Sequence, residues 1–144
     1  MTLDIAATGS AAMVRIARAK PLTGHSILLV EDEPLVALEV RAALLDGGAE
    51  VVQASDAPTA ARLIGDQAFT AAVLDINLGS MDCWIACRLL SRRNVPFLFH
   101  TGYTQSEILA EWPQAPVVNK PASRQRLIEA VADLLSPRAQ AQAK

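Results

Sequence analysis

The strongest constraint on the fold is an alternation, repeated five times, between a short apolar run and a stretch of helical periodicity. The alternation begins near Ser26 and continues to about Leu135. Continuous apolar runs of this length are typical of strands that are covered on both faces, as in a parallel sheet. The apolar runs occupy residues 27–30, 49–53, 71–74, 95–99 and 116–118.

Stretches of helical character fill the gaps between these runs. In the first stretch, Pro34 suits an opening helical turn, and the glycines at 47 and 48 suit a helix end. Asp56 and Asp82 are placed to cap the next two helices. A short fourth helix is expected over residues 105–111. The apolar residues at helical spacing are Leu35, Leu38, Ala42 and Leu45 in the first helix and Leu127, Ile128, Val131, Leu134 and Leu135 in the fifth.

This order of elements predicts an α/β fold, an open and doubly wound sheet with right-handed crossovers. A chain of 144 residues accommodates one such domain. We expect the domain over residues 25–136, with an N-terminal extension over 1–24, flexible or partly helical, and a tail over 137–144. Ligands of such sheets bind at the carboxyl ends of the strands. Functional residues should therefore follow the apolar runs directly.

Composition excludes several classes of protein. The net charge of −2 provides no basic field for nucleic acid. No stretch approaches the roughly 20 apolar residues of a membrane span, and the basic residues of the N-terminal extension follow its apolar residues, which is the reverse of a secretory signal. Cys83 and Cys87 lie four residues apart and match neither a redox pair nor a zinc site, so we expect reduced thiols. The sequence thus favours a cytoplasmic protein with no membrane insertion.

Polar side chains follow four of the five predicted strands. Glu31 and Asp32 come after the first, Asp75 after the third, Thr101 after the fourth and Lys120 after the fifth. Because the carboxyl ends of parallel strands meet at one edge of a sheet, these groups should converge there. Three close carboxylates repel one another strongly, so we expect a divalent cation beside them, and oxygen ligands suit Mg²⁺.

A phosphoryl group gives every member of this set a role. Asp75 can act as the nucleophile toward phosphorus, while Lys120 and the Thr101 hydroxyl contact phosphoryl oxygens. A pair of catalytic carboxylates, as in a glycosidase, is the alternative. That alternative leaves Thr101 and Lys120 without a role.

These residues resemble the receiver domains of two-component response regulators. The similarity covers about Ser26 to Leu135 and depends on "ILLVEDEP", "VLDINLGSMD", "FHTGY" and "NKP", which match in content, order and spacing. The resemblance implies a flavodoxin-like (βα)₅ fold with a five-stranded parallel sheet in the order 2-1-3-4-5. It further implies that Asp75 is the phosphoacceptor, that Thr101 and Lys120 contact the phosphoryl group, and that Mg²⁺ is held by Glu31, Asp32, Asp75 and the backbone carbonyl of Asn77.

The stretch "PFLFHTGY" resembles a single-domain subgroup with a Phe-Ala-Thr-Gly-Tyr signature, in which His100 replaces the usual alanine. Val117 stands where many receivers have an aromatic switch residue three positions before the lysine. We therefore expect Thr101 and Tyr103, with the short helix at 105–111, to act as the switch. His100 is interpreted as a packed or half-exposed residue and not as a second phosphoacceptor. Trp112 suits either core packing or a docking surface, and Trp84 suits ordinary packing.

The function favoured by the sequence is that of a phosphorylation-controlled binding module. A sensor histidine kinase or phosphotransfer protein would donate to Asp75, and the phosphorylated domain would bind a downstream protein partner. The enzymatic alternative is a Mg²⁺-dependent phosphotransferase or phosphatase with an aspartyl phosphate intermediate. Such enzymes have a second acid two residues after the nucleophile, where this chain has Asn77. A phosphorylation-independent scaffold would lack one of Asp75, Thr101 and Lys120, and all three are present.

Overall fold

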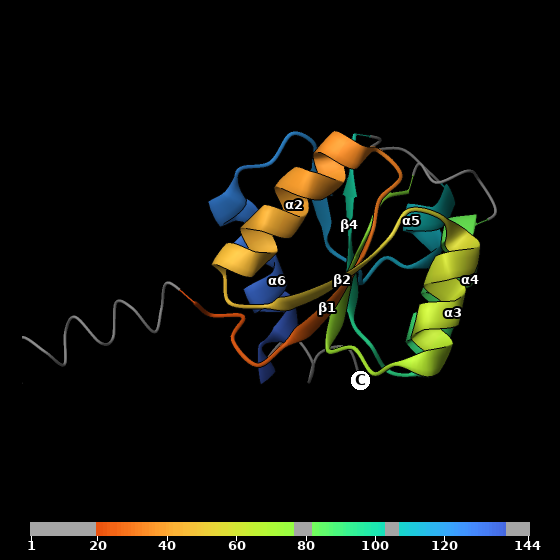
Figure 1. Cartoon of the computed structure of the whole chain (residues 1–144). Helices are drawn as coiled ribbons and strands as arrows, with labels where there is room; N and C mark the ends of the chain where they lie inside the picture. Colours follow the sequence, from red (N-terminus) through yellow and green to blue (C-terminus); the bar gives the residue numbers. More distant parts are fainter. Residues whose placement is uncertain (1–19, 77–81, 103–106, 138–144) are drawn as a thin grey trace, which may run out of the picture.

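The computed structural model describes residues 20–76, 82–102 and 107–137, and in them strands and helices alternate along the chain (Figure 1). No helix in these three ranges is both long enough and apolar enough to cross a membrane. The strands are β1 (Ser26–Val30), β2 (Glu50–Ala54), β3 (Ala71–Leu74), β4 (Phe97–Thr101) and β5 (Val117–Asn119). The helices are α2 (Pro34–Asp46), α3 (Ala57–Asp66), α4 (Asp82–Arg92), α5 (Glu107–Glu111) and α6 (Arg124–Leu135).

The five strands form one parallel sheet in the order β2-β1-β3-β4-β5, which confirms the predicted fold. The central strands are buried along nearly their whole length, as their unbroken apolar runs predict. The strand β3 has its predicted range, β1, β2 and β5 differ from theirs by one residue at one or both ends, and β4 is displaced by two residues, since it begins at Phe97 and continues through Thr101. Thr101 pairs with Asn119 of β5, and its carbonyl accepts a hydrogen bond from the Lys120 amide at 2.9 Å. The threonine therefore belongs to the strand and does not follow it.

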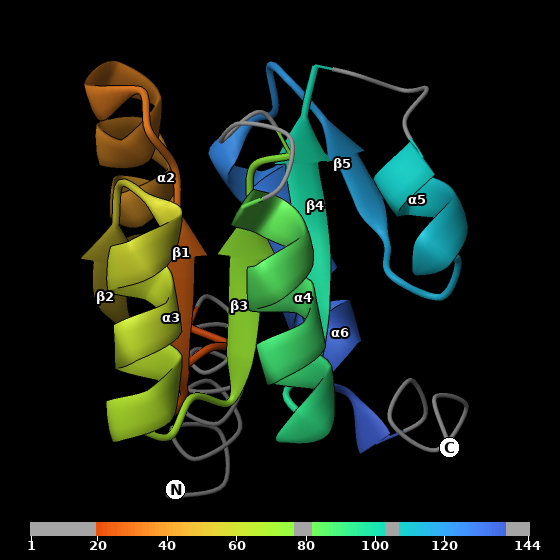
Figure 2. The ribbon, with the colours of Figure 1, turned by 90° about the vertical axis from the view of Figure 1, so that its right-hand side faces the viewer.

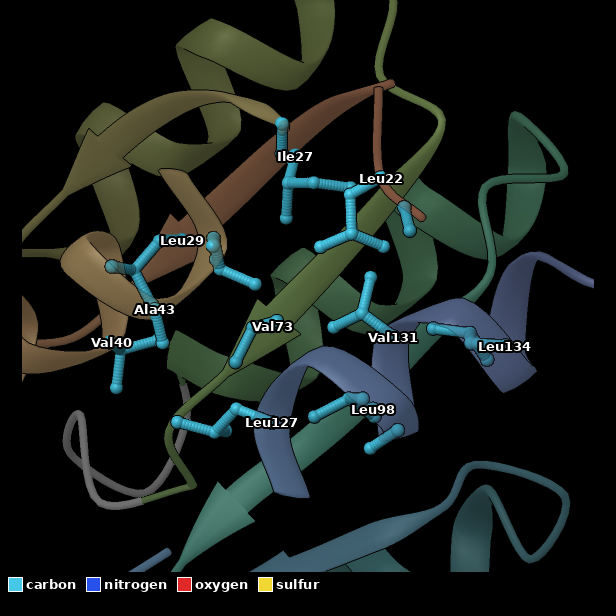
Figure 3. Packing of buried hydrophobic residues seen from close by; sticks show 14 of the residues in the cluster. Leu22, Ile27, Leu29, Val40, Ala43, Val73, Leu98, Leu127, Val131 and Leu134 are labelled. Carbon is cyan, nitrogen blue, oxygen red and sulfur yellow. The ribbon is translucent and has the colours of Figure 1, made fainter. Parts of the chain in front are cut away.

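Helices cover both faces of the sheet and enclose two hydrophobic cores. In Figure 2, α3 and α4 lie in front of the sheet and α6 lies behind it. Alternate residues of β4 divide between the cores: Leu98 joins the core under α2 and α6, and Phe99 joins the core under α3, α4 and α5. The first of these cores appears in Figure 3 and includes Leu22, Ile27, Leu29, Val40, Ala43, Val73, Leu98, Leu127, Val131 and Leu134.

Local capping fixes where two of the helices begin. Asp56 is the N-cap of α3, and its carboxylate accepts a hydrogen bond from the Thr59 amide at 2.8 Å. This contact confirms the predicted cap and lowers the pKa of Asp56, because the hydrogen bond favours the charged form. Ser123 caps α6 in the same way by accepting from the Arg126 amide at 3.1 Å.

Helix α2 packs on the sheet through a face different from the one that carries its leucine periodicity. A stripe of apolar residues at helical spacing usually faces the core. In α2 the exposed side chains include Leu35, Leu38 and Leu45, which form most of that stripe. The buried face consists of smaller or differently spaced residues, namely Ala37, Val40, Ala43 and Leu44.

Residues just before β1 are packed against the end of α2. Leu22 lies within the stretch predicted as an extension, yet it is fully buried in the core under α2 and α6. Its amide donates to the Gly47 carbonyl at 2.7 Å. A Cβ at Gly47 would come within 2.9 Å of the Leu22 side chain, so the glycine permits this close approach.

Candidate functional site: an acidic cluster with a bridging lysine

Two of the predicted site residues are placed by the ends of adjacent strands. The Glu31 amide donates to the Ala54 carbonyl at 3.0 Å, and the Asp75 amide donates to the Val30 carbonyl at 3.0 Å. The backbone pairing of the sheet thus continues one residue beyond β1 and β3. Both residues are 2 % exposed. Buried carboxylates at a sheet end require a compensating charge.

Asp32 completes an acidic cluster with these two residues. Carboxylate oxygens of Glu31, Asp32 and Asp75 all lie within 4.8 Å of one another. Glu31 and Asp75 are buried, whereas Asp32 is exposed, so the cluster opens to solvent on one side. Three convergent carboxylates with an open side suit Mg²⁺, which keeps several waters and takes few protein ligands.

Lys120 is the positive charge that contacts this cluster. Its Nζ donates to Glu31 Oε1 at 2.8 Å and to Asp75 Oδ2 at 3.2 Å. The lysine directly follows β5 and is held at the sheet edge by the hydrogen bond from its amide to the Thr101 carbonyl. The structure therefore brings Glu31, Asp75 and Lys120 together as the sequence predicts.

Burial and hydrogen bonding act on these groups in opposite directions. Desolvation raises the pKa of Glu31 to about 7, although the hydrogen bond from Lys120 lowers it in part. Desolvation would lower the pKa of Lys120, but its hydrogen bond to Glu31 and the charge of Asp75 outweigh that effect and raise it. Lys120 is therefore fully charged at neutral pH, whereas Glu31 is divided between its protonated and its deprotonated form at that pH.

Thr101 lies at the end of β4, where its carbonyl accepts the hydrogen bond from the Lys120 amide, and it is fully buried. Two of the predicted site residues, Asn77 and Tyr103, lie outside the described residues.

The His100 ring has surroundings that the sequence alone did not reveal. It is 4 % exposed, which fits the prediction of a packed residue, and neither ring nitrogen has a hydrogen-bond partner among the described residues. Desolvation, together with the nearby charge of Lys120, lowers the pKa of His100 to about 4, so the ring is neutral at pH 7. It lines a pocket of about 350 Å³ with residues of α2 and α6, among them Val36, Glu39, Val40, Arg124 and Leu127. Only the alternation of β4 signals that its side chain points toward these helices.

The aromatic and cysteine residues beyond the site are packed in the second core. Trp112 is buried, its indole Nε1 donates to Ser91 Oγ at 3.2 Å, and its ring meets that of Trp84 edge to face at 5.4 Å. Trp112 therefore contributes to packing between α4 and the end of α5. Cys83 and Cys87 are free and buried.

Comparison with known proteins agrees with this geometry. The family model described as the response regulator receiver domain matches residues 27–132. A response regulator receiver protein from Sinorhizobium medicae is 28% identical, with a TM-score of 0.71 over 79% of this chain and 96% of that one. The receiver domain of a sensor histidine kinase from Pseudomonas aeruginosa, solved with a magnesium ion in its active site cleft, is 27% identical, with a TM-score of 0.69 over 78% of this chain and 98% of that one. A search of curated proteins gave no match.

Proposed function

Because this chain belongs to the family of response regulator receiver domains of two-component signalling, we propose that Asp75 accepts a phosphoryl group from a phosphohistidine. Receiver domains interact with histidine kinases or phosphotransfer proteins, and we assign the donor to one of these two classes. The phosphorylated domain then signals by binding a downstream protein. The family is in general a signalling module and not an enzyme, so the chemistry expected here is phosphorylation and dephosphorylation of Asp75 itself.

The observation that carries this proposal is the position of Lys120. Its Nζ bridges Glu31 and Asp75, one of which is the proposed acceptor and the other a proposed metal ligand. A phosphoryl group on Asp75 would bring new oxygens to the same place, where the lysine can pair with them. A carboxylate that served only as a surface charge would not be buried with such a partner.

Transfer of the phosphoryl group to Asp75 needs little beyond positioning of the reacting groups and stabilisation of charge on the phosphoryl oxygens. An oxygen of Asp75 attacks phosphorus, the bond from phosphorus to the donor imidazole nitrogen breaks, and the electron pair of that bond stays on the imidazole. Lys120 pairs with a phosphoryl oxygen, and the Thr101 hydroxyl donates to another. Glu31, Asp32, Asp75 and the backbone carbonyl of Asn77 are the proposed holders of Mg²⁺, which neutralises charge on the phosphoryl oxygens when bound.

The rival proposal, a phosphotransferase or phosphatase, requires an acid that protonates the leaving group of a substrate. The residue two positions after Asp75 is Asn77, which cannot do so.

The free, buried cysteines agree with a reducing compartment, and we assign the protein to the cytoplasm on that basis.

Mapping of the acyl phosphate tests the proposal. The protein is incubated with acetyl phosphate and Mg²⁺, and the modified residue is located by mass spectrometry. We expect one phosphoryl group on Asp75 and none in Asp75→Asn. The Asp66→Asn variant, which removes an exposed aspartate at the end of α3, is the matched control and should be labelled like the parent. Undiminished labelling of Asp75→Asn contradicts the proposal.

A further inference from the structure

The outer face of α2 carries a row of exposed leucines. Leu35 is 76 % exposed, Leu38 64 % and Leu45 45 %. Residues three and seven apart lie on one side of a helix, so the three side chains form a continuous apolar stripe, called here the α2 stripe. Isolated exposed leucines are ordinary, but a row along one helix indicates a contact surface.

The chain enters the domain beside one end of the α2 stripe. Gly47 and Gly48 follow α2 directly, and a Cβ at Gly48 would lie 3.3 Å from the Cβ of Lys20. The hydrogen bond from the Leu22 amide to the Gly47 carbonyl fixes this arrangement. Figure 1 shows the first described residues beside the end of α2 that leads into β2. Residues 1–19 are therefore connected to the domain beside the glycines that follow α2.

These 19 residues have the length and chemistry to cover the stripe. A helix of 13 residues such as α2 is about 20 Å long, and 19 residues reach about 28 Å even when helical. Residues 1–19 contain two basic residues and one acidic residue, a net charge of +1, so the other residues carry −3 of the total of −2. The segment thus has the charge opposite to that of the domain. Its larger apolar residues are Met1, Leu3, Ile5, Met13, Val14 and Ile16.

We propose that residues 1–19 bind in cis along the α2 stripe. The tether favours this occupant over a second copy of the chain, because a short linker gives a local concentration in the millimolar range. Three leucines are also a small area for a stable dimer, which usually buries about 800 Å² on each partner.

Paramagnetic relaxation in the full chain tests this inference independently of phosphorylation. A nitroxide is attached to a Ser10→Cys variant, in which the buried Cys83 and Cys87 are protected from labelling. Methyl signals of leucine and isoleucine are then recorded at two protein concentrations. We expect the signals of Leu35 and Leu38 to lose the same fraction of their intensity at both concentrations. The signal of Ile85, exposed on α4, should keep its intensity and serves as the internal control.

Two variants of the labelled chain test whether apolar residues of the segment are responsible for the loss of signal. Met13→Asp combined with Ile16→Asp removes apolar residues of the segment and should restore the Leu35 and Leu38 signals, whereas Thr2→Asp should not. The substituted residues lie outside residues 27–132, which the receiver-domain family model matches. Broadening that grows with protein concentration would assign the stripe to a second copy and overturn the proposal. The proposal would also be overturned if the Leu35 and Leu38 signals showed no broadening, or if the Ile85 signal were broadened as much as theirs.

Discussion

Lys120 Nζ lies 2.8 Å from Glu31 Oε1 and 3.2 Å from Asp75 Oδ2, so one ammonium group holds two buried carboxylates. Replacing Lys120 by Met leaves those buried, desolvated carboxylates without a neighbouring cation. Removal of one partner from a buried ionic group typically costs about 3 kcal/mol or more. We expect Lys120→Met to lower the free energy of unfolding by about 3 kcal/mol at pH 8 in the absence of Mg²⁺.

The loss of stability caused by Lys120→Met should be smaller at pH 5. The pKa of Glu31 in the folded protein is about 7, so at pH 5 this group is mostly protonated and needs the lysine less. Chemical denaturation at both pH values measures the difference. Arg126→Met removes a positive charge from an exposed position on α6 and is the control. An equal effect of the two substitutions would contradict the bridging role of Lys120.

Mg²⁺ should stabilise the folded domain by relieving repulsion in the acidic cluster. A ligand that binds only the folded state adds about 1.4 kcal/mol to the free energy of unfolding at ten times its dissociation constant. We expect Asp32→Asn to lose most of this gain, since Asp32 is the exposed member of the proposed metal site. Glu50→Gln, at the amino end of β2, should respond like the parent. Thermal unfolding at increasing Mg²⁺ provides the measurement, and an unchanged response of Asp32→Asn contradicts the ligand assignment.

The strand-end residues could be predicted because their placement follows from the sheet alone. In a parallel sheet the carboxyl ends of neighbouring strands meet, so Glu31 and Asp75 converge whatever the helices do. The packed face of α2 could not be predicted in this way. That helix is apolar on nearly all sides, and which face it buries depends on the fit of small residues such as Ala37 and Ala43 against the sheet. The unpartnered ring nitrogens of His100 likewise depend on neighbours that only the folded chain brings together.

His100 should make the parent less stable as the solution is acidified. Its pKa falls from 6.5 to about 4 on folding, because burial disfavours the charged ring. The unfolded chain therefore binds a proton over this range that the folded chain does not bind. Stability attributable to this group is fully present above pH 6.5 and is lost as the pH falls toward 4, by up to about 3 kcal/mol.

The comparison with His100→Leu isolates this effect, since leucine adds no titrating group and suits the apolar neighbours Val36, Val40 and Leu127. The parent should lose stability relative to the variant between pH 6.5 and pH 4. His25→Leu is the control, because it replaces a histidine at the opposite end of the sheet. Urea denaturation across this range provides the free energies. A constant difference between the parent and His100→Leu would show that the ring is not desolvated as described.

The last prediction concerns how phosphorylation at Asp75 would reach the surface near α5. Thr101 ends β4, and Phe97 at the start of the same strand meets the Trp112 ring edge to face at 6.3 Å. Trp112 in turn contacts Trp84 and Ser91 of α4. Val117 on β5 has no ring that could report a movement. A displacement of β4 should therefore register at the Trp112 indole.

We expect beryllofluoride with Mg²⁺, which mimics the phosphoryl group, to shift the NMR signal of the Trp112 indole N–H. Thr101→Val keeps the shape of the side chain but removes the hydroxyl that we propose to contact the phosphoryl oxygens, so it should abolish most of the shift. Thr70→Val makes the same substitution at the opposite end of the sheet, where the Thr70 hydroxyl donates to the Ser26 carbonyl, and should leave the shift intact. Tyr103→Ala should reduce the shift if Tyr103 shares the switch role with Thr101. A Trp112 shift as large in Thr101→Val as in the parent would mean that the signal leaves the site by a route other than the end of β4.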